Sequence, residues 1–433
     1  MKKTIWIVFL ITLLFLSAGC REPSPGHAPS APPGAVDATR HGVSPENEGA
    51  QNSLALQALI DRLSEDGGTV YIPAGNYLFS ANGTQTIGSH CIKMRSNVSI
   101  VGDGESTVLR PTGDSLYGLD MFYFNDFLDT GDPVYLRNCR FEGFVIDAAG
   151  TSCEYYTSAG KGFMFNLFEN CHWKNVTVKN TDATGFGVDC PLDSTISACT
   201  AIACGKAASE ENTGASGFGI GFGYSENESL TITDCTANGN KKFGFFFEHQ
   251  GRFNDEKYGA TPKNPFTVKN CAADGNLFGF GGVCTENTVY ESCRSENSLR
   301  FGFLFKDSAN SKAVDCISES DKEASFAILQ TSHNEDFEVK GISFLRCKSK
   351  YAETGLKIVS ENPSAPMGAN SAENCVFEHI GTAVYTLGAM QSLTLSGNTS
   401  DTDENTFLAE INEFNNIGNS WNKADENARY HQK

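Results

Sequence analysis

The densest run of side chains able to move a proton is residues 248–252, which contains Glu248, His249 and Arg252. A carboxylate, an imidazole and a guanidinium at one place can abstract a proton, orient the abstracting group and hold a negative charge. His249 is therefore a candidate base, and Arg252 is a candidate partner for an anionic substrate group. The other interpretation, a histidine with a purely structural role, stays open.

Further candidates lie on segments that begin with a glycine and continue as an apolar strand. Counted from that glycine, positions +1, +3 and +5 point inward, and positions +2 and +4 point outward. The outward pairs, in chain order, are Gly187 and Asp189, Gly219 and Gly221, Phe246 and Glu248, Gly281 and Val283, and Leu304 and Lys306. Glycine weakens a strand, so its recurrence on the outer face predicts a shallow groove in which a substrate chain lies against the backbone. The alternative is that the glycines serve the twist of the strands.

Side chains in this groove form the predicted site. Asp189, Glu248 and Lys306 are expected to project into it from coils that lie within a few strands of one another. The residues expected to bind the substrate are Gly187, Gly219, Tyr224 and Phe246.

A recurring cysteine sets the register of these strands. It stands in similar local sequences at Cys199, Cys235, Cys271, Cys293, Cys316, Cys347 and Cys375. Positions 271, 293 and 316 are 22 and 23 residues apart, which indicates a coil of about 22 residues with loop insertions elsewhere. Cysteines in an exported chain normally suggest disulfides, but one small apolar residue per coil is typical of an inward-facing ladder of thiols. Cys139 and Cys171 have a different local sequence and are expected at an earlier strand position.

Strand, turn and strand at a constant spacing, without a helical period, predict an all-β protein that folds as a single-stranded right-handed parallel β-helix. Such a solenoid needs capped ends. Residues 51–64 have helical periodicity and are expected to form a short N-terminal capping helix. Residues 36–420 form the predicted β-helix domain, and residues 421–433 form a polar C-terminal tail.

The N-terminus predicts export. Lys2 and Lys3 precede an apolar run of about a dozen residues, which is too short to span a bilayer and typical of a signal peptide. Residues 16–20, Leu-Ser-Ala-Gly-Cys, resemble a bacterial lipobox. The resemblance implies that residues 1–20 are a lipoprotein signal segment, that the chain is cleaved before Cys20 and that this cysteine is lipidated. Residues 21–35 are rich in proline, serine and alanine and are expected to form a linker. We expect a monomer held at the cell envelope by its lipid, with a plain secretory signal as the alternative.

The formal net charge of −19 argues against nucleic acid as a partner, because nucleic acid requires a basic surface. The charge permits an acidic polysaccharide if a local basic patch or a bound cation offsets the repulsion. The insertion that follows Arg252 contains Lys257 and Lys263 and is expected to supply such a patch.

The pairing of the helix 51–64 with residues 66–77, Asp-Gly-Gly-Thr-Val-Tyr-Ile-Pro-Ala-Gly-Asn-Tyr, resembles the N-terminal cap of the pectate-lyase-like superfamily. The resemblance covers most of residues 36–420 and implies the β-helix fold. It does not imply one reaction, because lyases, hydrolases, epimerases and phage tailspikes share this fold.

Within the superfamily the chain most resembles mannuronan C5-epimerases of the alginate type. Residues 158–161, Ser-Ala-Gly-Lys, and residues 185–189, Gly-Phe-Gly-Val-Asp, are similar to the family segments TSGK and GYGFDP. The resemblance implies that Lys161 and Asp189 match active-site positions of that family. Two departures matter, because the family's tyrosine falls on Phe186 and its histidine falls on Phe243. Neither phenylalanine can transfer a proton. Either the base and the acid are supplied by other residues, with His249, Tyr224 and Lys306 as candidates, or the protein does not epimerise.

The expected function is removal of the C5 proton from a uronate in an acidic polysaccharide, either epimerase-like or as a polysaccharide lyase. This chemistry requires a neutralised carboxylate and a base. The residues that would neutralise the carboxylate are Lys161, Arg252 or Lys306. His249 would be the base, while Asp189 and Glu248 would hold Ca²⁺ or orient the base. The alternative is a non-catalytic glycan-binding or adhesion protein that uses the same groove.

Residues 180–182, Asn-Thr-Asp, are similar to the first motif of polygalacturonases, which are glycoside hydrolases. No Asp-Asp pair and no Gly-His-Gly follow at the spacing of the coils. Asn180 is therefore interpreted as a turn residue.

Overall fold

The computed structural model describes residues 31–81, 89–125, 133–209, 214–253, 258–332, 337–362, 365–402 and 404–421, apart from the side chains of residues 252 and 253. Cys20, the signal segment and residues 21–30 of the linker lie outside this part of the chain, as does the tail beyond residue 421. No helix among the described residues is long and apolar enough to cross a membrane.

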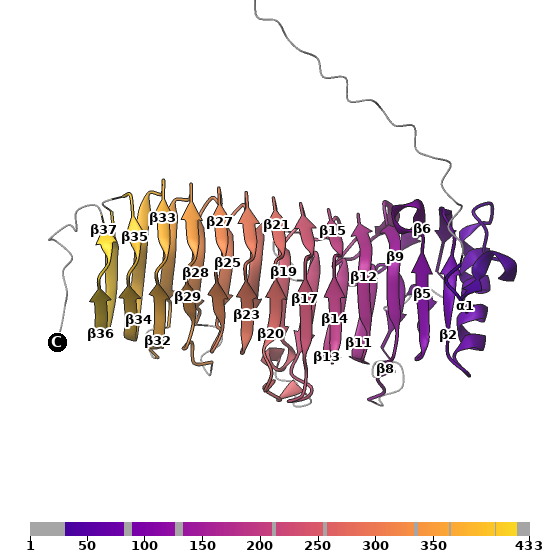
Figure 1. Cartoon of the computed structure of the whole chain (residues 1–433), viewed down its shortest axis with the longest axis horizontal. Coiled ribbons are helices and arrows are strands. Elements are labelled where there is room, and N and C mark those ends of the chain that lie inside the picture. Colours follow the sequence, from indigo (N-terminus) through magenta and orange to yellow (C-terminus); the bar gives the residue numbers. More distant parts are fainter. Residues whose placement is uncertain are drawn as a thin grey trace, which may run out of the picture. The chain divides into compact units, whose positions relative to one another are not determined.

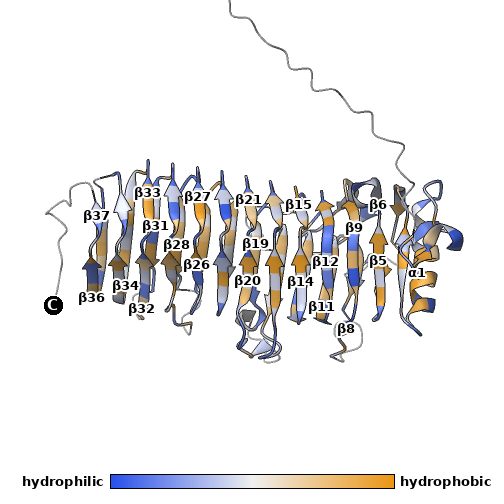
Figure 2. Cartoon of the chain, viewed as in Figure 1, coloured by the Kyte–Doolittle hydropathy of each residue, from blue (hydrophilic) through white to orange (hydrophobic). Residues whose placement is uncertain are grey.

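The body is a stack of coils that follow one another in chain order, from the capping helix α1 (Gly49–Leu63) to strands β36 and β37 (Figure 1). Neighbouring coils pair through parallel strands. The predicted right-handed parallel β-helix is therefore confirmed. Hydrophobic and hydrophilic residues alternate along the strands (Figure 2), as expected for strands with one buried and one outer face.

Three parallel sheets run along the stack. The first sheet consists of β4 (His90–Lys93), β7 (Asp120–Phe124), β11 (Phe163–Glu169), β13 (Phe186–Leu192), β16 (Phe218–Phe222), β19 (Phe243–His249), β22 (Phe278–Val283), β25 (Phe301–Lys306), β28 (Ala324–Gln330), β31 (Thr354–Ser360), β34 (Thr382–Ser396) and β36 (Thr406–Ile417). The short strand β8 (Leu136–Arg137) pairs with the end of β11.

The second sheet consists of β1 (Val36–Asp37), β2 (Gly68–Ile72), β5 (Val98–Gly102), β9 (Arg140–Asp147), β12 (His172–Lys179), β14 (Ser194–Ser197), β17 (Leu230–Thr233), β20 (Phe266–Lys269), β23 (Thr288–Glu291), β26 (Lys312–Val314), β29 (Ser343–Leu345) and β32 (Met367–Glu373). At the C-terminal end, β34 and β36 are long enough to belong to the first and second sheets together.

The third sheet begins with β3 (Gly75–Phe79), β6 (Thr107–Ser115) and β10 (Gly150–Cys153), and continues through the ends of β9 and β12. Its remaining strands are β15 (Thr200–Ile202), β18 (Thr236–Asn238), β21 (Ala272–Asp274), β24 (Arg294–Glu296), β27 (Ile317–Glu319), β30 (Lys348–Lys350), β33 (Val376–Glu378), β35 (Thr399–Ser400) and β37 (Ser420–Trp421). Within the described ranges there are also three 3-10 turns, η1 (Ala38–His41), η2 (Gly104–Ser106) and η3 (Gln250–Phe253).

The capping helix α1 begins two residues before the position expected from its periodicity. Glu48 and Gln51 form a reciprocal capping box, which satisfies backbone N–H groups at the start of the helix. The helix buries Leu56, Leu59 and Ile60 against the first coil. It therefore covers the open end of the solenoid core, as the sequence predicts.

Stacked aromatic rings fill the core beneath the first sheet. Phe186, Phe218 and Phe245 stack in a column with ring centroids 4.7 Å apart at each step, and the column continues through Phe280 and Phe303. These are the inward positions of the predicted register, and all are fully buried. The outward positions also align as predicted, since Gly219 pairs with Phe246 and Gly221 with Glu248.

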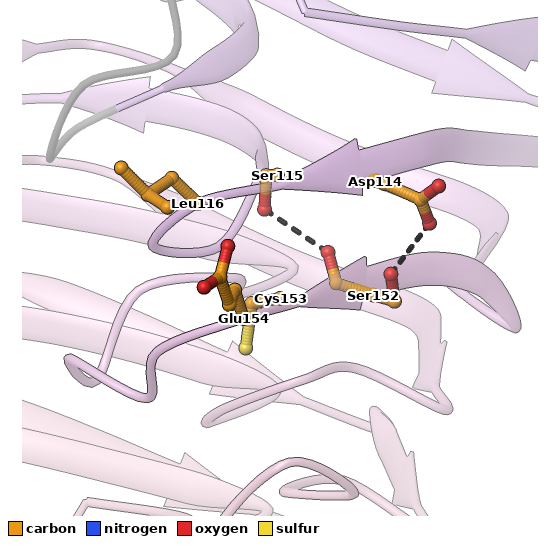
Figure 3. A pocket seen from close by; sticks show the side chains of 6 residues that line it. All are labelled: Asp114, Ser115, Leu116, Ser152, Cys153 and Glu154. Atoms are coloured by element: carbon orange, nitrogen blue, oxygen red, sulfur yellow. Dashed lines mark hydrogen bonds between the residues drawn. The ribbon is translucent and has the colours of Figure 1, made fainter.

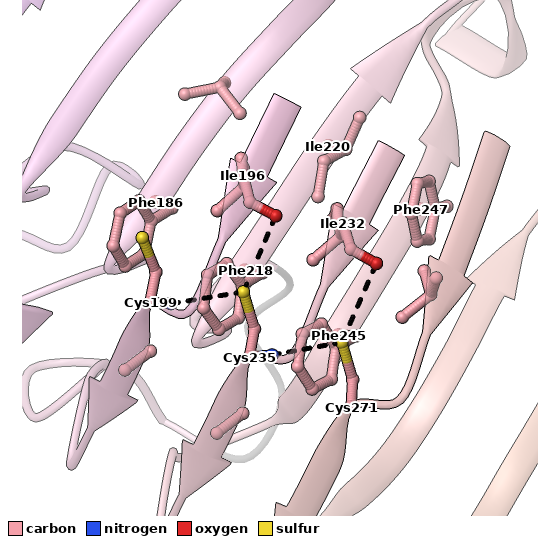
Figure 4. Close-up of a cluster of buried hydrophobic side chains, with 14 of the residues drawn as sticks. Phe186, Ile196, Cys199, Phe218, Ile220, Ile232, Cys235, Phe245, Phe247 and Cys271 are labelled. Atoms are coloured by element: carbon pink, nitrogen blue, oxygen red, sulfur yellow. Dashed lines mark hydrogen bonds between the residues drawn. The ribbon is translucent and has the colours of Figure 1, made fainter. Parts of the chain in front are cut away.

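The cysteine ladder lies beside this column (Figure 4). The Cys199 N–H donates to Cys235 Sγ at 3.4 Å, and the Cys235 thiol donates to the carbonyl of Thr233 at 3.2 Å. The seven ladder residues are buried free thiols, which confirms the interpretation as an inward-facing ladder. Cys139 and Cys171 occupy a separate, earlier column that continues at Ser194.

A buried thiol in this position behaves as a small apolar group, so we expect Cys235→Ser to destabilise the fold. The added hydroxyl must be desolvated in the core, at a cost of about 1–3 kcal/mol in the free energy of unfolding. Urea unfolding measures this loss, with Cys235→Ala expected to lose less than the serine variant. Cys153→Ser is the matched control, because Cys153 is half-exposed. Equal losses for Cys235→Ser and Cys153→Ser would contradict the burial argument.

Candidate functional site

A pocket of about 210 Å³ opens on the outer face of the first sheet, across strands β13, β16 and β19. Its lining consists of Ser158, Lys161, Thr184, Gly187, Asp189, Gly214, Gly219, Ile220, Gly221, Phe246, Glu248 and Gln250. The structure thus brings together six residues of the predicted site, namely Lys161, Asp189, Glu248, Gly187, Gly219 and Phe246.

The glycines of the pocket make room for side chains from neighbouring strands. A Cβ atom at Gly187 would lie 2.5 Å from Cδ of Lys161, and one at Gly221 would lie 2.6 Å from Oδ1 of Asp189. A side chain at either position would displace the lysine or the carboxylate. The glycines are therefore needed to lay Lys161 and Asp189 across the strands, a reason for their recurrence that the sequence did not reveal.

Asp189, on β13, is one of the two carboxyl groups that line the pocket. Its Oδ1 accepts the backbone N–H of Gly221 at 2.7 Å. Burial raises the pKa of Asp189, and the Lys161 ammonium and the Gly221 N–H oppose that shift only in part. Asp189 therefore takes up a proton more readily than an exposed aspartate does.

Lys161 owes its position to a buried carboxyl that the sequence analysis did not single out. Asp120 Oδ1 accepts the N–H of Gly160 at 2.9 Å and that of Lys161 at 2.7 Å. Gly160 has a φ of +89°, which only glycine adopts readily. The turn before β11 is held in this way, and the lysine side chain extends past Met164, whose Sδ lies 3.2 Å from Nζ.

Burial raises the pKa of Asp120 to about 6, although the N–H groups that it accepts lower it in part. The charged groups that face it are Lys161 and Asp182. A carboxyl whose pKa is higher in the folded than in the unfolded chain contributes stability that is complete below the unfolded pKa of about 4 and is lost as the pH rises through 6.

We therefore expect Asp120→Asn, which does not titrate, to gain stability relative to the wild type as the pH rises from about 4 to 8. A shift of about two pKa units corresponds to about 3 kcal/mol in the free energy of unfolding. Urea unfolding at several pH values measures the difference. Asp315→Asn is the control, because the Arg346 hydrogen bond lowers the pKa of that exposed carboxyl. The contribution of Asp315 is lost only as the pH falls below about 4, so this variant should show no comparable change between about pH 4 and pH 8. A constant difference between Asp120→Asn and the wild type at all pH values would contradict the expectation.

The segment 180–182 does not contribute to the pocket. Asn180 has a φ of +59° and donates through Nδ2 to Asp147 at 2.8 Å, so it is the turn residue that the sequence predicts. Asp182 is 1% exposed, and the Nζ of Lys206 lies 3.3 Å from its Oδ1.

His249, the predicted base, is not among the residues that line the pocket. Its Nδ1 accepts the N–H of Gly251 at 3.0 Å, and its Nε2 donates to the carbonyl of Ala260 at 3.0 Å. Burial also lowers the pKa of the ring. In this arrangement both ring nitrogens are bonded to the backbone, which ties His249 to the insertion that follows β19. The assignment of His249 as the base stays a prediction, with these two contacts against it.

Two other predicted residues, Lys306 and Tyr224, are not among the residues that line the pocket, and the side chain of a third, Arg252, is not described. Lys306 pairs through Val283 with Glu248, two strands further along the stack. Tyr224 lies in the turn after β16, where its ring contacts Tyr258 at a centroid distance of 6.2 Å. The side chain of Arg252 lies outside the described part of the chain.

The two phenylalanines that stand where a mannuronan epimerase has its tyrosine and histidine are both apolar contacts here. Phe186 is fully buried in the core column between Phe163 and Phe218. Phe243 packs on the outer face against Phe246 at a centroid distance of 4.5 Å. Neither position is a proton-transfer position in this chain.

Calcium does not fit the described residues of the pocket. Asp189 and Glu248 come from strands with β16 between them, Gly221 N–H occupies Asp189 Oδ1, and the ammonium of Lys161 shares the pocket. Among the described residues, no group of three or more His, Cys, Asp or Glu side chains converges as a metal site. We assign no step to a metal ion.

A second pocket, on the outer side of β6 and β10, contains none of the predicted residues (Figure 3). Ser152 Oγ donates to Asp114 at 2.6 Å, and Ser115 Oγ donates to the carbonyl of Ser152 at 3.1 Å. Its polar groups thus bond to one another, and no cation lines it to offset Asp114 and Glu154.

Comparisons with known proteins agree with this fold. The A-module of the Azotobacter vinelandii mannuronan C-5 epimerase AlgE6 is similar with a TM-score of 0.51 and 18% identity, over 89% of this chain and 95% of that one. The Agl-KA catalytic domain is similar with a TM-score of 0.59 and 15% identity, over 91% of this chain and 69% of that one. A tailspike protein of E. coli bacteriophage HK620 in complex with pentasaccharide has a TM-score of 0.54 and 16% identity, over 84% of this chain and 66% of that one.

At these identities the solved structures establish the fold alone. A comparison with curated proteins gives no match. The family model described as rhamnogalacturonase A/epimerase, pectate lyase-like, matches residues 42–304. That range is more than half of the 433 residues, and it includes Lys161, Asp189 and Glu248. The chain therefore belongs to the rhamnogalacturonase A/epimerase, pectate lyase-like family.

Proposed function

We propose that the protein acts on an acidic polysaccharide by abstracting the C5 proton of a uronate residue, with an epimerase-like or lyase outcome. The observation that carries the proposal is the pocket in which one ammonium group, Lys161, lies with two carboxyl groups, Asp189 and Glu248. An ammonium and a protonated carboxyl can neutralise a sugar carboxylate, and a second carboxylate can take the proton.

The roles follow from the surroundings of each group. Lys161 pairs with the uronate carboxylate, which makes the C5 proton acidic. Asp189 has a raised pKa, so its protonated form donates a second hydrogen bond to the same carboxylate. Glu248 projects from β19 across Gly221 and becomes the base in place of His249. The carbanion at C5 then either takes a proton from water on the opposite face, which gives the C5 epimer, or expels the 4-O-linked sugar to form a C4–C5 double bond, and the leaving oxygen takes the proton back from Glu248.

The pair of carboxyl groups favours hydrolysis as a second candidate. Two strand spacings of about 4.8 Å separate the backbones of Asp189 and Glu248. Inverting glycosidases place an acid and a base about 6.5–9.5 Å apart on either side of the scissile bond. The raised pKa of Asp189 would suit it to the role of the acid.

One set of assays separates the candidates. The protein is incubated with polymannuronate, alginate and pectate, with and without Ca²⁺. Unsaturated chain ends, seen by ultraviolet absorbance, identify a lyase, and deuterium uptake at C5 identifies an epimerase. New reducing ends without unsaturation identify a hydrolase and contradict the C5 mechanism. Retardation of the protein in a polysaccharide gel without any of these signals identifies a glycan-binding protein and contradicts an enzymatic role.

We also propose that the protein is exported and lipid-anchored at the cell envelope through Cys20. The proposal rests on the apolar segment and the Leu-Ser-Ala-Gly-Cys sequence of residues 16–20. Cys20→Ala should move the protein from the membrane fraction to the soluble fraction of the envelope. An unchanged distribution would contradict the anchor.

A further inference from the structure

A continuous set of aromatic rings leads away from the pocket along the outer face of the first sheet. Phe246, which lines the pocket, stacks on Phe243 at 4.5 Å, and Phe243 stacks on Phe278 at 4.6 Å. Phe301 follows at 5.9 Å from Phe278. These rings belong to a cluster that is separate from the solenoid core. The ring of Phe243 takes the space above Gly281, where a Cβ atom would lie 2.6 Å from it.

Two cations lie on these rings. Arg300 Cζ is 5.0 Å from the centroid of the Phe301 ring and 5.7 Å from that of Phe278. Lys357 Nζ is 5.9 Å from the centroid of Phe301 and 6.0 Å from that of Tyr385 on β34. We call the set Phe243, Phe278, Arg300, Phe301, Lys357 and Tyr385 the aromatic–cationic surface. It continues from the pocket wall on β19 to β34.

Glu323 joins the two cations. Its carboxylate accepts from Arg300 Nε at 2.8 Å and from Lys357 Nζ at 2.8 Å. Burial alone would raise the pKa of Glu323, but these two cations hold it below its usual value. One carboxylate against two cations leaves a net positive charge on this surface, with the Arg300 side chain 49% exposed.

The outer face of the first sheet beyond the pocket carries positively charged residues, whereas the chain as a whole is acidic. Positions +2 and +4 of the strands beyond the pocket are Gly281 and Val283, Leu304 and Lys306, Ala327 and Leu329, Lys357 and Val359, and Tyr385 and Leu387. All ten lie within the described residues, and their charged members are Lys306 and Lys357. The whole chain has 52 acidic and 33 basic residues. These ten positions bear two lysines and no acidic residue, while Glu323 between Arg300 and Lys357 is one carboxylate against two cations. A face with this excess of positive charge complements a polyanion.

We propose that this face holds the continuation of an acidic polysaccharide chain whose reacting residue occupies the pocket. The chain runs along the solenoid axis, its sugar rings lie over the half-buried Phe278 and Tyr385, and its carboxylates pair with Arg300, Lys306 and Lys357. Phe301 is buried and supports Arg300 and Lys357 from beneath. From β19 to β34 the path spans five strand spacings, or about 24 Å. The pocket then lies within a bound polymer, so the protein acts inside chains. The inference rests on the proposed function for the identity of the sugar that reacts in the pocket. Binding of the polymer to this surface does not depend on the proposed reaction.

The test uses the full chain with both cations replaced by neutral residues of similar shape, Arg300→Gln and Lys357→Gln together. Retardation in gels that contain polymannuronate or pectate measures polymer binding, and gels with a neutral glucan serve as reference. The matched control is Arg346→Gln, because Arg346 has the same 50% exposure and also pairs with a carboxylate, Asp315, but lies in the turn between β29 and β30.

The double variant should bind acidic polymer about tenfold more weakly, measured as its mobility in the acidic gel relative to its own mobility in the neutral gel, while Arg346→Gln gives the wild-type ratio. Where turnover is measurable, its KM should rise for long chains and stay unchanged for a disaccharide or trisaccharide. Unchanged retardation of the double variant, or equal loss in Arg346→Gln, would overturn the proposal. Loss of binding in the double variant without turnover by any form would uphold this surface and contradict the proposed reaction, so the two proposals fail separately.

Discussion

Replacing Lys161 by alanine should lower kcat/KM on the acidic polymer by about 10²–10³-fold, because the substrate carboxylate then lacks its neutralising ammonium as negative charge develops at C5. The loss should appear mainly in kcat, since the charge that Lys161 stabilises grows toward the transition state. Turnover of the polymer, followed by the signal that the wild type gives, measures both parameters.

Two controls make this result specific. Lys348→Ala removes a lysine that pairs with Glu378 at 2.7 Å on the third sheet, and it should leave the rate unchanged. Lys161→Arg keeps the charge but needs more room above Gly187, so it should retain part of the activity. A Lys161→Ala variant as active as the wild type would remove the lysine from the mechanism. An equal loss of kcat/KM in Lys348→Ala would mean that the rate depends on the net charge of the protein and not on the position of Lys161.

Two recurring residues, a cysteine and a glycine, led from the sequence to this pocket, and each recurs for its own physical reason. One cysteine per coil marks an inward position, and a glycine at the start of each strand marks where the alternation begins. Together they assign Asp189 and Glu248 to the same outer face, and parallel stacking then brings them within two strands. Lys161 was identified from the family resemblance of residues 158–161. Strand alternation could not identify it, because it lies in the turn before a strand.

What the sequence could not predict depends on contacts made by loops. His249 follows Glu248 directly, yet its ring bonds to the backbone of Gly251 and Ala260, and the path of an insertion cannot be read from strand alternation. The sequence analysis also did not identify Asp120. It stands beside an apolar run, Met-Phe-Tyr-Phe, and its role depends on the N–H groups of a turn 40 residues later.

The aromatic–cationic surface shows the same limit. Phe243, Phe278 and Phe301 align in neighbouring strands, but the glycine count places them on the same parity as core residues. The structure instead puts their side chains in a buried cluster outside the solenoid core, where the strands begin. Only the packing of Phe243 over Gly281 reveals which face they occupy.

The pair Glu248→Gln and Asp189→Asn should separate C5 proton abstraction from hydrolysis. Glu248→Gln removes the base in either mechanism and should lower kcat by about 10²–10⁴-fold with little change in KM. Asp189→Asn distinguishes them, because an amide still donates a hydrogen bond but cannot give up a proton to a leaving group.

If Asp189 neutralises a uronate carboxylate, the asparagine variant should keep activity within about tenfold of the wild type. The fall in wild-type activity at high pH, which reflects ionisation of a carboxyl with a raised pKa, should also disappear in that variant. If Asp189 is instead the acid of a hydrolase, the variant should lose as much activity as Glu248→Gln. Rates of both variants between about pH 5 and pH 9 decide the question, because only a group that hands over its own proton makes the neutral amide as inactive as the missing base.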